Sequence, residues 1–448
     1  MSRLELVARP PTPVAQSLAK LESLVSAYVG VVRGADEVLA LTDDMPAPSV
    51  ICQTGHCREL VGAGDAHRGT GGGPTIADAR AAAVGEAVER YSACFTESAD
   101  AIVATARELG PKAVDPSRFA LFADEQYAEP GFEYHPFTAE TPVAWVRGWR
   151  LPHGAPAYLP AQLVYLAWSQ SPDEARIGHA TSNGLACHAT LEEATLAGLL
   201  ELLERDAFMI TWTASISWPL LSWPSDLHLT DFERRYIRPT GLHASAVDLS
   251  AVWGVPTVLG VARSDAPNEA PFGVGAGAAA TVQRAVGRAF DEAVRVRSWA
   301  RSIRYDDPAG ELVLPAHEIR EFDEHIRFYA YDDGARRASF LDASEDRRDV
   351  ADVPCLEGAS PRAQINALCN RLERQNASAY IVDVTSPDVA DAGLRVVRVV
   401  APELCPLDVE HAARLLGSQR LYDVPARLGM RTRRLRFDEL NPDPHPFP

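Results

Sequence analysis

Lysine is almost missing from this chain, which has only Lys20 and Lys112 among its 43 lysine and arginine residues. Asp and Glu together number 61, so the formal net charge is −18 and the sequence pI is about 5.1. Such an acidic chain, without a basic stripe, argues against a nucleic-acid partner. We attribute the preference for arginine to genomic composition bias.

Long apolar runs are also missing. No stretch approaches the ~18 apolar residues of a membrane-spanning helix. The N-terminal sequence, MSRLELVARPPTP, has no apolar segment typical of a signal peptide. We therefore expect a soluble, cytoplasmic protein with no membrane partner.

Paired cysteines are absent as well, because the seven cysteines are scattered and form no C-x-x-C motif. Cys52, His56 and Cys57 lie close enough in the sequence to suggest metal ligands. No second ligand pair follows them at a spacing typical of zinc sites. We interpret these thiols as structural or incidental, in a reduced protein.

Familiar catalytic motifs are the last group that the chain lacks. It has no G-x-x-x-x-G-K-[ST], no G-x-S-x-G and no H-E-x-x-H. A nucleotide would have to be bound without a Walker motif.

What is present is a chain of 448 residues, 46% of them hydrophobic, which is enough for two or three domains or one large one. We divide it into an N-terminal region, residues 1–60, and a main domain, residues 61–448. Helices are expected near residues 78–94, 189–206 and 281–301, and strands near 143–168, 242–262 and 378–400.

Three segments have less regular patterns. GTGGGPT at 69–75 predicts a loop that leads into the first helix, with Thr75 as its N-cap. Glycine alternates from Gly273 to Gly277 before the third helix. Residues 305–360 are rich in Asp, Arg and Pro, which predicts a mobile or inserted surface segment.

The first two helices share the motif E-x-x-E-R on otherwise apolar segments. Glutamates three residues apart share one face of a helix, and like charges there repel each other. Burying them costs several kcal/mol each unless a cation neutralises them, and magnesium ions with the phosphates of a nucleotide would do so. A solvated helix face is the alternative. The motif residues are Glu86, Glu89 and Arg90 in the first helix, and Glu201, Glu204 and Arg205 in the second.

Two further acidic positions extend this pattern. Glu193 lies eleven residues before Glu204, on the same stripe of the helix, and is also placed to complete a capping box with Thr190. In the third helix, Arg288 and Glu292 are i,i+4 neighbours, which in isolation indicates an ordinary surface ion pair.

The chain ends in NPDPHPFP, where every second residue from Pro442 to Pro448 is proline. A polyproline II tail is rigid and could place the terminal carboxylate in a cleft. A disordered tail is the alternative.

Four segments, in order, resemble the YcaO family across residues 61–448. They are HRGTGGGPTIADARAAAVGEAVERYSA, TSNGLACHATLEEATLAGLLELLERDAF, RAFDEAVRVR and IVDVTSPDVADAGLRVVRVVAPEL. The resemblance implies an α/β fold in which mixed β-sheets pack with helices and an ATP site lies between the motif helices. It also implies ATP and Mg²⁺ as cofactors.

The same resemblance assigns roles to individual residues. It implies Mg²⁺ ligands at Glu86, Glu89, Glu193, Glu201 and Glu204. It implies contacts with ATP at Ser182, Asn183, Arg90, Arg205, Arg288 and Glu292.

The ending PHPFP resembles that of YcaO proteins that form azolines in ribosomally made peptides. It implies that the Pro448 carboxylate acts as a base or orienting group, with Arg288 and Glu292 as further catalytic residues. In the implied reaction, a Cys, Ser or Thr side chain attacks the preceding carbonyl, and ATP phosphorylates the amide oxygen. Thioamidation, amidine formation and a non-catalytic docking subunit are the alternatives.

Four positions depart from the family pattern, and they are Gly72, Ala82, Ala189 and Arg295. Gly72 stands where a lysine is common, so one phosphate contact is lost, and either another arginine substitutes or the nucleotide binds more weakly. The acidic set is complete, which favours an active protein.

The resemblance also implies partners. Residues 1–60 are too few for the ubiquitin-activating-like (ThiF-like) domain that binds the leader peptide in fused relatives. We therefore expect a separate ThiF-like partner that docks on residues 1–60, a precursor peptide as substrate, and in some assemblies a flavin-dependent dehydrogenase. We expect a homodimer or a hetero-complex.

Overall fold

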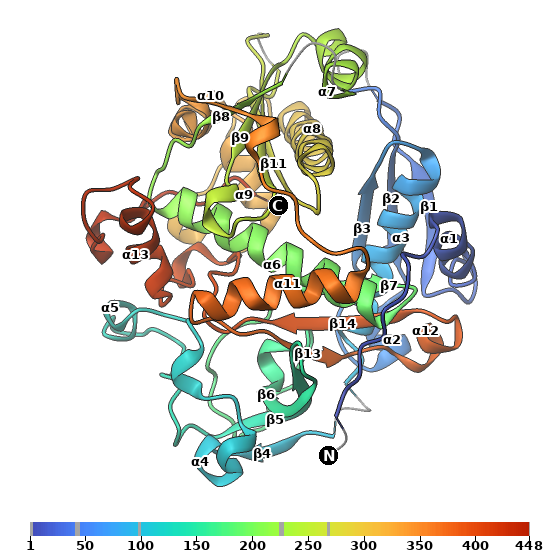
Figure 1. Cartoon of the computed structure of the whole chain (residues 1–448), viewed down its shortest axis with the longest axis vertical. Helices are drawn as coiled ribbons and strands as arrows, with labels where there is room; N and C mark the ends of the chain where they lie inside the picture. The colour runs from blue at the N-terminus through green and yellow to red at the C-terminus, as the bar shows by residue number, and fades with distance from the viewer. Residues whose placement is uncertain (1–2, 41–44, 97–99, 224–227, 267–268, 448) are drawn as a thin grey trace.

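The computed structural model describes residues 3–40, 45–96, 100–223, 228–266 and 269–447. Its strands form three sheets, and helices pack on each of them (Figure 1). The predicted α/β class is confirmed. Among the described residues, no helix combines the length and apolarity needed to cross a lipid bilayer.

The first sheet has the order β1-β2-β3 and is antiparallel. It consists of β1 (Val32–Glu37), β2 (Ser49–Thr54) and β3 (Arg68–Gly72). Because β2 pairs with β3, this sheet crosses residue 60, and part of the N-terminal region shares it with the main domain. Helices α1 (Val14–Glu22) and α3 (Ile76–Ser92) pack together beside it.

Residues 69–72 of the GTGGG segment belong to β3, so the predicted loop is wrong there. Gly69 and Gly71 of β3 face α3, where a Cβ atom would lie 2.2 Å from the carbonyl oxygens of Ala83 and Ala79. The glycines therefore let the helix backbone contact the strand backbone. Thr75 is confirmed as the N-cap of α3, since its hydroxyl accepts a hydrogen bond from the Asp78 N–H at 3.2 Å.

The second sheet has the order β11-β10-β9-β8-β12 and packs against α8 (Val282–Asp306), which confirms the third predicted helix. The glycine alternation lies on β11 and repeats the contact seen at β3. Added Cβ atoms at Gly273, Gly275 and Gly277 would lie 2.3–2.6 Å from backbone carbonyl oxygens of α8. The strands are β8 (Leu220–Ser222), β9 (His243–Asp248), β10 (Thr257–Arg263), β11 (Phe272–Ala278) and β12 (Arg347–Asp349).

The third sheet has the order β4-β5-β13-β14-β7, and β6 also pairs with β5. The strand predicted to continue to residue 168 ends at Pro160. After it, Val164 and Tyr165 donate backbone hydrogen bonds to Ala161, and these three residues are buried at helical spacing. The strands are β4 (Ile102–Ala104), β5 (Val143–Arg150), β6 (Ala155–Pro160), β7 (Leu185–His188), β13 (Tyr380–Asp383) and β14 (Arg395–Val400).

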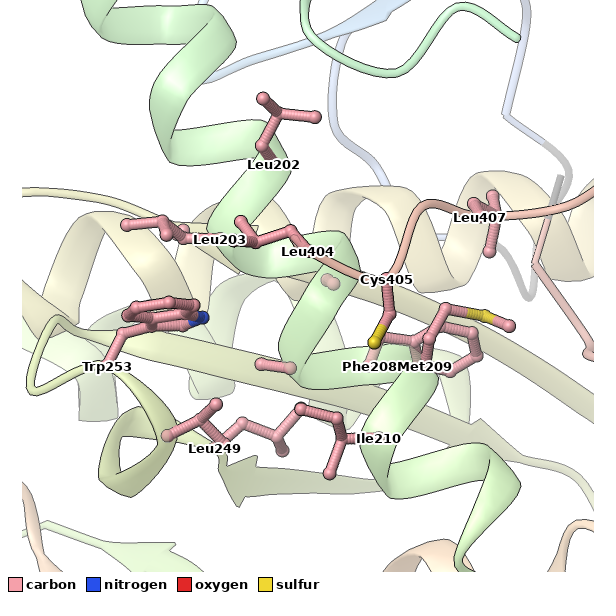
Figure 2. Close-up of a cluster of buried hydrophobic side chains, with 14 of the residues drawn as sticks. Leu202, Leu203, Phe208, Met209, Ile210, Leu249, Trp253, Leu404, Cys405 and Leu407 are labelled. Atoms are coloured by element: carbon pink, nitrogen blue, oxygen red, sulfur yellow. The ribbon is translucent and has the colours of Figure 1, made fainter. Parts of the chain in front are cut away.

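Helix α6 (Leu191–Thr213) runs through the centre of the molecule, between the second and third sheets and beside α11 (Pro361–Arg374) (Figure 1). Its second half is almost fully buried. Figure 2 shows side chains of this half meeting Leu249 and Trp253 on one side and Leu404 on another. This core fixes the position of α6 between the sheets.

Residues 305–360 are not a loose surface insertion, so that prediction is wrong. They include α9 (Phe322–Tyr329) and α10 (Asp332–Arg337). His325 and Tyr329 of α9 are buried and contact the backbone carbonyls of His445 and Pro444, at 2.8 and 2.5 Å.

The remaining helices are short and lie mainly at the surface. They are α2 (Cys57–Val61), α4 (Ala106–Leu109), α5 (Asp124–Tyr127), α7 (His228–Phe232), α12 (Pro387–Asp391) and α13 (Gln419–Arg427).

The contact between β11 and α8 predicts a large effect of a single methyl group. In Gly275→Ala the Cβ would lie 2.4 Å from the Ala293 backbone nitrogen, so the helix and strand must separate. We expect a loss of about 3 kcal/mol or more in the free energy of unfolding, measured by urea denaturation.

The control is Gly287→Ala. Gly287 lies in α8, and an added Cβ there would meet open space. It should be neutral or stabilise the protein by up to about 1 kcal/mol. Equal stability of the two variants would contradict the proposed backbone contact.

Candidate active site

A cavity of about 800 Å³ lies between α3, α6 and α8. It is lined by eight carboxylates from these three helices. They are Asp78, Glu86 and Glu89 of α3, Glu193, Glu201 and Glu204 of α6, and Asp291 and Glu292 of α8. The structure therefore brings together all five glutamates predicted to bind Mg²⁺.

Backbone N–H groups of the glycine-rich strands orient one glutamate from each helix. Glu86 accepts a hydrogen bond from Thr70 at 2.8 Å, Glu204 from Ala278 at 2.7 Å, and Glu292 from Ala276 at 2.7 Å. These bonds are short because the helices lie so close to the strands. The second oxygen of Glu86 pairs with Arg90, and the second oxygens of Glu204 and Glu292 lie 3.8 Å from Arg205.

Burial raises the pKa of several of these carboxylates above the usual value. Burial raises the pKa of Glu89 well above its usual value, and the charge of Glu201 raises it further. Burial also raises the pKa of Glu201 to about 7. The pKa of Glu292 is raised by burial despite the neighbouring Arg205. The acidic set is therefore incompletely neutralised by the protein.

Arg205 lies among these carboxylates, with its guanidinium nitrogens 3.8 Å from oxygens of Glu204 and Glu292. At that distance the contacts are weaker than a hydrogen-bonded ion pair. Its Nη1 is buried, and none of the described residues gives it a hydrogen-bond acceptor. Arg205 is therefore free to bind an anion in the cavity.

Helix α8 contributes a row of arginines to the same cavity, Arg284, Arg288 and Arg295. Arg288 donates to the Ala278 carbonyl at 3.2 Å. Arg295 pairs with Asp291 at 3.1 Å. Sequence reasoning identified Arg288 but missed Arg284, although its i,i+4 spacing from Arg288 is a usable signal.

Two of the departures from the family pattern are neighbours in space. An added Cβ at Gly72 would lie 2.1 Å from a carboxylate oxygen of Asp291, so a side chain at position 72 would collide with this carboxylate. Asp291 in turn binds Arg295, which also contacts the Thr70 hydroxyl at 3.4 Å. The Asp291–Arg295 pair therefore fills the space beside Gly72 and places an arginine there.

Arg398 of β14 was missed by sequence reasoning and lies behind the acidic set. It is 2% exposed and donates to the carbonyls of Val164, Asn183 and Thr181. Burial lowers its pKa to about 10, while the charges of Glu201 and Glu89 act to raise it. A single arginine inside the apolar strand RVVRVV is the sequence signal that could have identified it.

Glu193 is bound by the N-terminal segment. It accepts hydrogen bonds from the Thr12 N–H at 2.5 Å and the Thr12 hydroxyl at 2.9 Å. It also contacts Thr190, the N-cap of α6. Burial acts to raise the pKa of Glu193, but these bonds lower it overall. Its predicted role as a metal ligand stays a prediction, and binding a metal would require exchange of Thr12.

Three predicted ATP contacts lie elsewhere. Arg90 pairs with Glu86 at 2.5 Å and donates to the Arg68 carbonyl at 2.6 Å, outside the cavity lining. Asn183 is buried and its amide holds the backbone of Leu407 through two hydrogen bonds. Ser182 also lies outside the lining. The roles of these residues in ATP binding stay predictions.

The C-terminal tail is buried and runs along α6 toward Arg205 (Figure 1). The ring of Phe447 is fully buried, lies 4.5 Å from that of Phe208 and is covered by the Arg205 guanidinium, also at 4.5 Å. His445 stacks on His325 at 4.2 Å. Pro448, the predicted catalytic residue, lies outside the described residues.

Comparison with known proteins assigns the chain to a family. A family model described as a YcaO cyclodehydratase that binds ATP and Mg²⁺ matches residues 70–405. The chain therefore belongs to the YcaO family, which confirms the resemblance. An uncharacterized protein from Methanothermobacter thermautotrophicus is 25% identical over 358 residues, which are 78% of this chain and 85% of that protein.

Solved structures confirm the fold. A heterocyclase in complex with substrate and cofactor has a TM-score of 0.82 and 25% identity over 100% of this chain. The chain spans 59% of the length of that heterocyclase. The YcaO protein from Methanopyrus kandleri, bound with AMPPCP and Mg²⁺, has a TM-score of 0.59 and 22% identity over 86% of this chain and 88% of its own.

ATP and Mg²⁺ are thus the cofactors of this family, and the cavity fits them. The carboxylates with raised pKa values supply the hard oxygen ligands that Mg²⁺ prefers. The unsatisfied Arg205 and the arginines of α8 suit the phosphates.

The raised pKa of Glu201 predicts how stability changes with pH without nucleotide or metal. The carboxyl ionises at its usual value of 4.5 in the unfolded chain but at about 7 in the folded one. Stability is therefore lost as the pH rises from about 4.5 to about 7. Glu201→Gln should remove this part of the pH dependence, so between these pH values the variant gains about 3 kcal/mol in the free energy of unfolding relative to wild type, measured by urea denaturation.

Exposed Glu345 provides the control, and Glu345→Gln should follow the wild-type profile. If the free energies of unfolding of wild type and Glu201→Gln depend on pH in the same way, the prediction is contradicted.

Proposed function

We propose that this protein catalyses ATP-dependent cyclodehydration of Cys, Ser or Thr residues in a ribosomally synthesised precursor peptide, giving thiazolines or oxazolines. The observation that supports the proposal is the buried tail, in which the ring of Phe447 lies against Arg205 at the carboxylate cavity. A group on this tail would be close to a substrate bound beside the nucleotide.

In the proposed reaction the side-chain sulfur or oxygen bonds to the preceding carbonyl carbon. The carbonyl oxygen takes the γ-phosphoryl group of ATP and then leaves as phosphate, so each ring loses the atoms of one water. An amide oxygen is a poor leaving group, and phosphorylation makes its departure feasible. The protein needs no nucleophile of its own, which agrees with the motifs that its sequence lacks.

The chain's own residues bind and orient in this scheme. Glu86, Glu89, Glu201 and Glu204 would hold Mg²⁺, and Glu193 would join them on release of Thr12. Arg205 and Arg288 would stabilise negative charge on the phosphoryl group. Glu292 orients Arg205 from α8. The Pro448 carboxylate would take or orient the proton of the attacking side chain.

The N-terminal region supports the proposed docking of a separate partner. In β1, an edge strand, backbone groups are available to another chain. Large apolar side chains beside it are exposed, with Tyr28 at 96%, Val29 at 90% and Leu39 at 85%. Such a patch suits a ThiF-like protein that binds the leader peptide. A flavin-dependent dehydrogenase would act on the azolines afterwards.

The reaction is tested by intact-mass spectrometry of a precursor peptide incubated with this protein, its partner, ATP and Mg²⁺. Loss of one water per ring with matching phosphate release is expected. A mass gain that fits exchange of oxygen for sulfur would instead indicate thioamidation. If the peptide mass does not change and no ATP is consumed, the protein is a non-catalytic docking subunit.

Glu204→Gln tests the proposed metal site. The glutamine can still accept the Ala278 hydrogen bond but cannot bind Mg²⁺ as a carboxylate, so ATP turnover should fall by about 10²-fold or more while the melting temperature is kept. Glu345→Gln, at an exposed position, should retain full turnover. Turnover of Glu204→Gln within tenfold of wild type would remove Glu204 from the metal site.

Deletion of Pro448 tests the role of the terminal carboxylate. It moves the carboxylate back by one residue and leaves the Phe447 ring available for its contacts with Phe208 and Arg205. Ring formation should fall by about tenfold or more, whereas ATP affinity and the melting temperature stay constant.

Phe447→Ala is the comparison, since it removes a fully buried ring and should cost about 3 kcal/mol of stability. If deletion of Pro448 lowers ATP affinity and ring formation equally, the tail is structural and has no catalytic role.

A further inference from the structure

A second group of chemically reactive side chains lies outside the carboxylate cavity. It consists of Cys57, His67 and Cys94, whose Sγ and ring nitrogen atoms all lie within 4.8 Å of one another. The two cysteines are fully buried and His67 is half-buried. These residues are far apart in the sequence, so the fold alone brings them together.

Three different elements supply this group. Cys57 is the first residue of α2, His67 immediately precedes β3, and Cys94 follows the end of α3. The backbone of His67 exchanges hydrogen bonds with Thr54 of β2, at 2.8 Å to the hydroxyl and 2.9 Å from the N–H. The backbone at each position is therefore fixed by ordinary secondary structure.

The ring of His67 faces a sulfur atom. Its Nε2 lies 3.3 Å from the Cys94 Sγ. A neutral imidazole has a lone pair that can bind a metal ion. A disulfide between Cys57 and Cys94 would not require a histidine beside them. A zinc ion is commonly bound by cysteine sulfur and histidine nitrogen together.

We propose that Cys57, His67 and Cys94 bind a divalent transition-metal ion, with zinc favoured by two thiolates and one imidazole. Tetrahedral zinc, with Zn–S of about 2.3 Å and Zn–N of about 2.0 Å, places its ligand atoms about 3.5–3.8 Å apart. The observed separations of 3.3 Å and up to 4.8 Å require shifts of about an ångström or less. The fourth position is left for a water molecule.

The proposed ion joins α3 to the first sheet. Cys94 lies at the end of the helix that carries Glu86 and Glu89, and His67 is three residues before Thr70, which orients Glu86. Two thiolates and a neutral imidazole carry two negative charges, which a divalent ion balances in a buried place. The ion would stabilise the helix position without taking part in ATP chemistry.

The test uses wild-type protein that is equilibrated with Zn²⁺, desalted and analysed for metal by mass spectrometry. We expect about one zinc per chain and a lower melting temperature after chelation. Co²⁺ in its place should give the near-ultraviolet absorption of a cobalt–thiolate bond. This spectrum distinguishes the site from the carboxylate cavity and requires no enzymatic activity.

Substitution of single cysteines tests which thiols bind the ion. Cys57→Ser and Cys94→Ser should each lose the zinc and the cobalt–thiolate absorption. Cys355→Ser, at an exposed cysteine, should keep both. If the serine variants fail to fold, the wild-type metal content and cobalt spectrum still decide the question.

Three results would overturn the proposal. Wild-type protein could retain no zinc. Bound cobalt could lack thiolate absorption, which would indicate that the cobalt binds to the carboxylates of the active-site cavity. Peptide mapping without reductant could also find a Cys57–Cys94 disulfide, which would make the group a redox pair.

Discussion

The close contact between glycine-rich strands and helix backbones is the constraint on which the site depends. Gly69 and Gly71 bring α3 onto β3, and the glycines of β11 do the same for α8. At this distance, backbone N–H groups of the strands reach Glu86, Glu204 and Glu292. The three motif helices are thereby held around one cavity. Larger side chains on either strand would push the helices away and separate the carboxylates.

This arrangement has an electrostatic cost, because eight carboxylates of the three motif helices line one cavity with only four arginines. Arg205 is too far from its acidic neighbours for strong ion pairs, and Arg398 is committed to backbone carbonyls. The raised pKa values of Glu89 and Glu201 report the remaining repulsion. Metal ions bound here would remove this repulsion, and the free energy released would add to their affinity.

The sequence predicted those parts of the site that depend on local spacing. The E-x-x-E-R motifs define one face of a helix, and Thr75 is the N-cap of the same segment. Both features depend on residues that are close in the sequence, so they could be predicted from it. The strand at residues 68–72 was missed because its glycines are explained only by the helix that packs on them. The role of Arg398 and the hydrogen bonds from Thr12 to Glu193 were missed, because these contacts join residues far apart in the chain. Residues 305–360 were misjudged because the tail that they bury lies at the other end of the sequence.

The central claim is that the glutamates of α3 and α6 hold the metal ions that carry the nucleotide. Crystals grown with Mn²⁺ in place of Mg²⁺ and a non-hydrolysable ATP analogue test it most directly, through the anomalous scattering of manganese. The account predicts manganese peaks beside Glu89, Glu201 and Glu204, with the phosphates near Arg205 and Arg288. Manganese or nucleotide bound outside this cavity would contradict it.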